Sequence, residues 1–363
     1  MGRLHDLYST GGQSPWLDNL KRGWITSGEI QRWVDRGVRG ITSNPAIFQK
    51  AIESGAEYDD QFRDLVGAGT SIEDAYWNLV VDDISEALRI LRPVYDESNG
   101  IDGYVSVEVA PSLARDRART EVAARELDDR IAAPNLLVKI PGTAECVPAI
   151  QTMIAEGRSI NVTLIFTLER YEAVIEAYLA GLEAATGDLS NIASVASFFI
   201  SRVDTEIDRR LDAVGTPEAL ELRGTAAVTQ GQLAYAIFEE RFSGPRWSAL
   251  QARGAQAQRP LWASTSTKNP AFPDTLYVDA LIGPNSVNTI PDATLEAFDD
   301  HGTVVRTIDA DLPAANARWA RLSAIVDLDD VGRVLEAEGV GSFEKSFDEL
   351  LAVLDAKAAT FTS

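Results

Sequence analysis

Eight short runs of β-branched and apolar residues recur along this chain, and segments with helical patterns lie between them. The runs are Pro15–Asp18, Gly40–Pro45, Tyr104–Pro111, Leu136–Thr143, Ile160–Phe166, Ile192–Ser201, Leu261–Thr267 and Tyr277–Ile282. Strands that alternate with helices predict parallel βα units, and eight such units predict a closed barrel. We therefore expect an α/β fold, a (β/α)8 TIM barrel with additional helices.

The length of the chain leaves room for more than the barrel. A (β/α)8 barrel typically needs about 250 residues, and this chain has 363. We expect residues 1–363 to form one domain, with extra helices roughly at 50–100, 205–258 and 305–363. Apolar residues at helical spacing predict helices in three segments, Ile72–Leu91, Thr167–Ala185 and Phe343–Leu354. The Gly- and Gln-rich stretch Arg241–Arg259 is expected to form a surface loop. Glycine-rich nucleotide motifs are missing, which disfavours an open doubly wound sheet.

The charge of the chain and the scarcity of two residue types disfavour several functional classes. A net charge of −22 opposes binding to nucleic acids and to anionic membrane surfaces. Two histidines and one cysteine supply a metal site poorly and cannot form an internal disulfide. We therefore expect no metal and no cofactor.

Targeting signals are also missing from the sequence. The segment Met1–Leu20 lacks a basic start followed by an apolar core. No apolar run approaches the ~18 residues that a membrane-spanning helix needs. We expect a cytoplasmic protein with no membrane partner, as a monomer or a homodimer.

Polar residues occur near the C-terminal ends of the predicted strands, the face at which barrel enzymes place their active sites. These residues are Asp18, Asn44, Glu108, Lys139, Asn161, Thr163, Ser197, Arg202 and Lys268. Many of them are separated by roughly one βα unit. This spacing is expected if successive strands deliver side chains to one pocket.

Lys139 interrupts an otherwise apolar strand, both faces of which are buried in a barrel. Burial favours the neutral amine, and a neutral amine is the nucleophile that forms an imine with a ketone. Glu108, in the preceding strand, could relay protons during this reaction. A lysine that caps the strand, or that only forms an ion pair with Glu108, explains the position equally well.

The remaining polar residues suit the other tasks of such a site, although each also has a simpler explanation. Asp18 could be the base for a sugar hydroxyl, or it could cap a turn. Asn161 and Thr163 share one strand face and could hold a water and a substrate hydroxyl. Asn44 could do likewise, although it also suits an ordinary turn before a proline.

Two cations end the sixth and seventh predicted strands. Arg202 follows a strand that carries the hydroxyl of Ser197, and Lys268 follows a strand rich in serine and threonine. Hydroxyl groups beside cations suit a phosphate clamp. Either cation could instead be a charge on the rim of the barrel.

Several of these fragments, in their order along the chain, resemble the motifs of the transaldolase family. They are Ser14–Asp18, Gly40–Pro45, Val105–Val109, Leu137–Thr143 and Ile160–Phe166, with a C-terminal counterpart at Val331–Val340 and Phe343–Leu351. The motifs around Lys139 and Asn161 are the most specific in combination. The resemblance covers nearly the whole chain, and the chain's length matches the larger bacterial branch.

The resemblance implies four catalytic residues. Lys139 would form the Schiff base with the sugar, and Asp18 would act as the acid and base for bond cleavage. Glu108 and Thr163 would relay protons through a water molecule.

The resemblance also implies five residues that bind the substrate. Asn44 and Asn161 would bind the dihydroxyacetone unit, and Ser197 and Arg202 would bind the phosphate group. Lys268 lies where many members of the family have an arginine, and lysine cannot make the planar bidentate contact with phosphate.

The activity implied by this resemblance is transfer of dihydroxyacetone from sedoheptulose 7-phosphate to glyceraldehyde 3-phosphate. The products would be erythrose 4-phosphate and fructose 6-phosphate, so the expected partners are phosphorylated sugars. Three alternatives stay open: a fructose-6-phosphate aldolase, a non-catalytic binder of sugar phosphates and a metal-dependent aldolase. The last is disfavoured by the scarcity of histidine.

Overall fold

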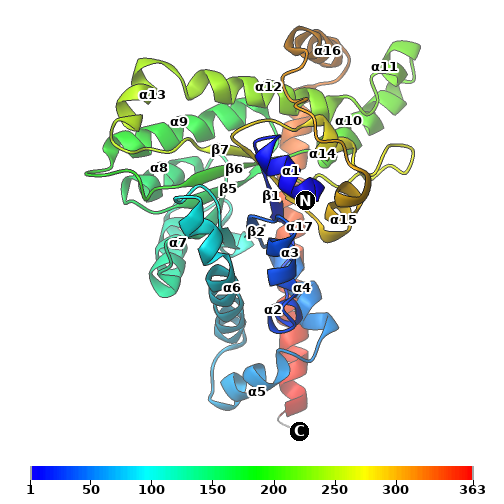
Figure 1. Ribbon diagram of the computed structural model, residues 1–363. Helices are drawn as coiled ribbons and strands as arrows, with labels where there is room; N and C mark the ends of the chain where they lie inside the picture. The colour runs from blue at the N-terminus through cyan, green and yellow to red at the C-terminus, as the bar shows by residue number, and fades with distance from the viewer. Residues whose placement is uncertain (1, 362–363) are drawn as a thin grey trace.

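The computed structural model describes residues 2–361, apart from the side chain of Ser54. Eight parallel strands form a closed barrel in sequence order (Figure 1). They are β1 (Gln13–Leu17), β2 (Gly40–Thr42), β3 (Tyr104–Glu108), β4 (Leu136–Pro141), β5 (Ile160–Ile165), β6 (Ser194–Phe199), β7 (Arg259–Ala263) and β8 (Ser286–Ile290). β1 closes the barrel by pairing with β8. The prediction of a (β/α)8 TIM barrel is therefore confirmed.

Helices connect the strands and surround them. They are α1 (Arg3–Ser9), α2 (Arg22–Thr26), α3 (Glu29–Asp35), α4 (Pro45–Ser54), α5 (Asp59–Gly67), α6 (Ile72–Glu97), the 3-10 helix η1 (Pro111–Leu113), α7 (Arg117–Ile131), α8 (Val147–Ala155), α9 (Leu168–Ala184), α10 (Ser201–Val214), α11 (Pro217–Glu221), α12 (Ala226–Arg241), α13 (Gly244–Gln251), α14 (Leu276–Ala280), α15 (Asp292–His301), α16 (Leu312–Ile325) and α17 (Leu328–Phe361). Several helices in succession follow β2, β6 and β8. Among residues 2–361, no helix is long and apolar enough to cross a membrane.

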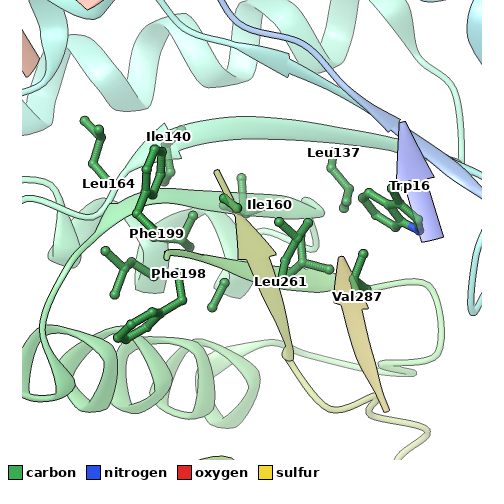
Figure 2. Close-up of a cluster of buried hydrophobic side chains, with 14 of the residues drawn as sticks. Trp16, Leu137, Ile140, Ile160, Leu164, Phe198, Phe199, Leu261 and Val287 are labelled. Carbon is green, nitrogen blue, oxygen red and sulfur yellow. The ribbon is translucent and has the colours of Figure 1, made fainter. Parts of the chain in front are cut away.

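The barrel interior is filled by apolar side chains from several strands, among them Trp16, Leu137, Leu261 and Val287 (Figure 2). The indole ring of Trp16 occupies so much of this space that its neighbour on β2 must be a glycine. A Cβ atom at Gly40 would lie only 2.4 Å from a carbon of that ring. The filled interior forms a floor beneath the C-terminal ends of the strands.

A buried carboxylate holds the N-terminal ends of the strands together. Asp102, which precedes β3, accepts hydrogen bonds from Arg39 at 2.9 Å and Arg259 at 3.0 Å. It also accepts bonds from Ser14 and Trp16 on β1. These two guanidinium groups hold the pKa of Asp102 below its usual value, against the opposing effect of burial. The network belongs to the end of the barrel opposite the predicted site.

Two predictions about secondary structure are wrong. Tyr277–Ile282 contains helix α14, and the eighth strand follows it at Ser286–Ile290. The apolar residues of Tyr277–Ile282 occur in pairs four residues apart, which is helical spacing. The expected surface loop Arg241–Arg259 contains helix α13, in which Trp247 and Leu250 are buried.

The C-terminal helix α17 is a single element of 34 residues. In Figure 1 it runs from behind the barrel to the far end of the molecule, where it lies beside α4 and α5. Seven of its buried residues recur at intervals of three or four: Gly332, Leu335, Gly339, Phe343, Phe347, Leu350 and Leu354. One continuous face of this helix therefore packs first on the barrel and then on helices α4 to α6.

Candidate active site

A cavity of about 130 Å³ opens at the C-terminal ends of the strands. Seven of the nine predicted site residues line it: Asp18, Asn44, Lys139, Thr163, Ser197, Arg202 and Lys268. The remaining two, Glu108 and Asn161, lie directly behind lining residues and are hydrogen-bonded to them. The barrel thus brings together residues that are up to 250 positions apart in the chain.

Lys139 and Glu108 form a buried pair in the wall of this cavity. The two residues lie opposite each other in the β3–β4 pairing, and Lys139 Nζ donates a hydrogen bond of 2.9 Å to Glu108 Oε2. Only 6% of Lys139 and 7% of Glu108 are exposed. Burial raises the pKa of Glu108, although the charge of Lys139 opposes this rise. A proton that moves from the nitrogen to Glu108 leaves a neutral amine without changing the net charge of the pair.

Asp18 directly follows β1 and lines the same cavity as Lys139. Burial raises the pKa of Asp18, while the charge of Lys139 and a hydrogen bond from Thr42 lower it. The hydroxyl of Thr42 donates to Asp18 Oδ1 at 2.8 Å and lies 2.6 Å from the hydroxyl of Thr289. Since a hydroxyl has one proton, Thr289 is the donor to Thr42. Such a carboxyl group suits acid and base catalysis near neutral pH.

An irregularity at the end of β5 places a hydroxyl next to the lysine pair. The pairing of β5 with β6 shifts between Val162 and Ile165, and Leu164 has a φ of +63°. A bulge of this kind redirects neighbouring side chains. Thr163 lines the cavity here, and its buried Oγ1 has no hydrogen-bond partner among the described residues. This oxygen is free to bind a water molecule or a substrate hydroxyl.

The two asparagines differ in what they offer a ligand. Asn161 is fully buried, and its side chain donates to Ser106 at 3.0 Å and accepts from Ser197 at 2.7 Å. Ser197 therefore stands between Asn161 and the cavity. Asn44 caps α4, because its Oδ1 accepts a hydrogen bond from the backbone of Ile47. The side-chain amide of Asn44 is left as a donor at the cavity.

Two cations also line the cavity. Arg202 lies in the first turn of α10, over the ring of Phe199, and Lys268 lies in the loop that follows β7. Lys268 donates to Ser266, and partial burial together with the charge of Arg202 lowers its pKa. Within residues 2–361, neither cation pairs with a carboxylate at salt-bridge distance. Two unpaired cations in a chain of net charge −22 indicate a site for an anion.

Several lining residues are not found by the sequence argument. Thr42 could have been recognised, because it is a polar residue directly after the apolar Ile41 in the predicted strand Gly40–Pro45. Thr289 is not predicted as a site residue, because the eighth strand is predicted in the wrong place. Phe343 comes from α17, and no local pattern relates it to Lys139.

Comparison with known proteins relates this chain to one family. The model of the family described as Transaldolase/Fructose-6-phosphate aldolase matches residues 15–354. A transaldolase of Parafrankia sp. (strain EAN1pec) is 51% identical over 354 residues, which cover 96% of each chain. A transaldolase of Thermobifida fusca (strain YX) is 50% identical over 97% of each chain. A transaldolase of Saccharopolyspora erythraea is 52% identical over 95% of each chain.

Proposed function

This chain belongs to the transaldolase/fructose-6-phosphate aldolase family, and from that membership we propose that it is a transaldolase, a transferase of the class I aldolase type. It moves a dihydroxyacetone unit from sedoheptulose 7-phosphate to glyceraldehyde 3-phosphate. The products are erythrose 4-phosphate and fructose 6-phosphate, in the non-oxidative pentose phosphate pathway. The observation that carries this proposal is the buried Lys139–Glu108 pair in the wall of a cavity that two unpaired cations also line.

In this proposal the first stage is formation of an imine on Lys139. The hydrogen bond to Glu108 supports it, because Glu108 can take a proton from the nitrogen as the amine attacks C2 of the ketose. Glu108 passes this proton, and then a second one from the same nitrogen, to the C2 oxygen, which leaves as water. The hydroxyl of Thr163 has no partner among the described residues, so it can bind the water molecule through which Glu108 exchanges protons with the substrate.

The second stage is cleavage of the bond between C3 and C4. Asp18, in its ionised form, takes the proton of the C4 hydroxyl, and the electrons of the broken bond move into the imine. An aldose phosphate leaves, and an enamine of dihydroxyacetone stays on Lys139. The acceptor aldehyde then reacts in the reverse sense, with Asp18 returning its proton to the new hydroxyl. Water adds to C2 of the product imine, and cleavage of the C–N bond releases the product and the free amine of Lys139.

The binding residues divide between the two ends of the substrate. Arg202 and Lys268, with Ser197, hold the phosphate group, supported by their lack of carboxylate partners. The amide of Asn44 donates to a hydroxyl of the dihydroxyacetone unit. Asn161 also belongs to this end, and the hydrogen bond that it accepts from Ser197 links it to the phosphate end.

The same proposal covers the cellular setting of the protein. We expect it to act in the cytoplasm as a monomer or a homodimer, on phosphorylated sugars and not on nucleic acid. The net charge of −22 supports the last point, because the surface repels polyanions.

Borohydride trapping tests the proposal. With fructose 6-phosphate as donor, reduction should attach a dihydroxyacetone unit to the peptide that contains Lys139, as measured by mass spectrometry. The adduct should disappear in Lys139→Ala and persist in Lys268→Ala at a saturating donor concentration. An adduct that survives Lys139→Ala would refute the assignment.

A further inference from the structure

The C-terminal helix α17 lies directly on the end of β5, because two of its contact positions have no side chain. A Cβ atom at Gly332 would lie 2.2 Å from Thr167 Cγ2, and one at Gly339 would lie 2.9 Å from Leu164 Cδ2. Leu164 belongs to the β5 bulge, next to Thr163 of the cavity. These close contacts fix the distance between α17 and the end of β5.

One turn after Gly339, the helix places Phe343 in the wall of the active-site cavity. The ring centroid lies 5.8 Å from Lys139 Nζ, and only 6% of Phe343 is exposed. The ring offers no hydrogen-bonding group, so water that reaches the nitrogen from this side meets an apolar surface. Its π-electrons also favour a positive charge on that nitrogen.

The next turn of α17 anchors the helix to a different part of the molecule. The ring of Phe347 packs at 5.4 Å from that of Tyr76 and at 6.4 Å from that of Trp77, both on α6. Leu350 and Leu354 are fully buried further along the same face. Figure 1 shows this half of α17 beside the helices inserted after β2. The backbone of α17 at Phe343 is therefore held between two segments that pack on other parts of the protein.

The enamine on Lys139 has two possible fates. It can attack an acceptor aldehyde, which is transfer. Alternatively, its carbon takes a proton, one water adds to C2 of the resulting imine, and the C–N bond breaks to release dihydroxyacetone and the free amine. That water replaces the one lost when the imine formed, so the net result is aldol cleavage. Transfer also ends with addition of water to C2 of the product imine, so the two routes differ in the protonation of the enamine carbon, for which water is the proton donor.

We propose that Phe343 is a specificity-determining residue of this enzyme: its ring keeps water from the Lys139 intermediate and so favours transfer over release of dihydroxyacetone. This inference rests on the proposed transaldolase activity. It assigns to α17 a role in the chemistry as well as in stability. The description of the chain's family also names fructose-6-phosphate aldolase, an activity that follows the second route.

The test compares Phe343→Leu with the matched control Phe347→Leu. Both residues are phenylalanines on one helix face, and each is 6% exposed, but only Phe343 lines the cavity. The measured quantity is the rate of dihydroxyacetone release from fructose 6-phosphate without acceptor, divided by the rate of transfer from fructose 6-phosphate to erythrose 4-phosphate, which gives sedoheptulose 7-phosphate. Phe343→Leu should raise this ratio by about fivefold or more, whereas Phe347→Leu should leave it at the wild-type value.

A second variant covers the case in which Phe343→Leu does not fold. Phe343→Gln keeps a long side chain with good helix propensity and brings a group that binds water, so it should also raise the ratio. An unchanged ratio in a folded Phe343 variant, or an equal rise in Phe347→Leu, would overturn the inference. If wild-type protein gives neither a borohydride adduct nor transfer, the proposed function fails instead.

Discussion

The hydroxyl of Thr42 donates a hydrogen bond to Asp18, and this bond opposes the effect of burial on the pKa of that carboxyl group. Thr42 is in turn held by Thr289, so a short chain of hydroxyls from β2 and β8 reaches the proposed acid and base. The ionised form of Asp18 accepts this bond more strongly than the neutral form. Thr42 therefore helps to keep Asp18 ionised, as a base must be.

Thr42→Val should move the acidic limb of the pH profile of kcat to higher pH. Valine keeps the shape of threonine but cannot donate, so the pKa of Asp18 rises further and more acid remains protonated at a given pH. The profile is measured with fructose 6-phosphate and an acceptor between pH 5 and 9. Thr265→Val is the matched control, because Thr265 is fully buried and donates to Asn288 instead. Both variants should lose about 1 kcal/mol of stability, and equal pH profiles would contradict the role given to Asp18.

Glu108→Gln should slow formation of the imine more than cleavage of the sugar. The amide can still accept a hydrogen bond from Lys139, but it cannot take the proton that the nitrogen must lose. A loss of about 10²-fold is expected for a missing acid and base catalyst. Single-turnover reactions quenched with borohydride measure imine formation, and release of aldose phosphate measures cleavage. Wild-type rates of imine formation would show that another group receives the proton.

Arg202→Met should raise KM for phosphorylated donors by about 10- to 100-fold, the effect of losing a hydrogen bond to a charged group. The discrimination between fructose 6-phosphate and fructose should fall by the same factor. Arg209→Met, on the same helix, is the control, because Arg209 is largely exposed and pairs with Glu206. If both variants discriminate as the wild type does, Arg202 does not bind the phosphate.

The sequence predicts best where a residue's character conflicts with its surroundings. Lys139 inside an apolar strand is such a conflict, and strand alternation alone places it on the same face as Leu137. Pairing with Glu108 follows from the order of β3 and β4. The β7 end is different: the predicted strand runs to Thr267, but β7 ends at Ala263, and Ser264 has a φ of +57°. A backbone turn of this kind depends on packing that no local pattern encodes.

The eighth strand is predicted in the wrong place, and Phe343 is not predicted as a site residue. Both failures have the same cause. Ser286–Ile290 contains Asn288 and Thr289, so it has too little apolar character to be recognised as a strand, although all of it is buried. The side-chain oxygens of Asn288 and Thr289 have hydrogen-bond partners in Thr265 and Thr42, which are remote in sequence. Phe343 likewise has an apolar pattern that fits any buried helix. Only the tertiary structure shows that this turn of the helix meets Lys139.

The packing of α17 on the barrel leads to a last prediction, which contrasts two glycines of that helix. Alanine normally stabilises a helix by about 1 kcal/mol relative to glycine. Gly341 is exposed and has nothing within 4 Å of a Cβ atom, so Gly341→Ala should raise the melting temperature. At Gly332 the added carbon would overlap the methyl group of Thr167, whose hydroxyl accepts a hydrogen bond from the backbone of Arg170 and caps α9.

Because Thr167 cannot turn away without losing this cap, worth about 1 kcal/mol, Gly332→Ala should lower the melting temperature despite its better helix propensity. Denaturation of both variants by urea gives the two free energies of unfolding, and their order is the result that matters. If Gly332→Ala stabilises the protein as much as Gly341→Ala, then α17 does not rest on the end of β5 at this point. The close contact that holds Phe343 beside Lys139 would then have to arise from Gly339 and the α6 anchor alone.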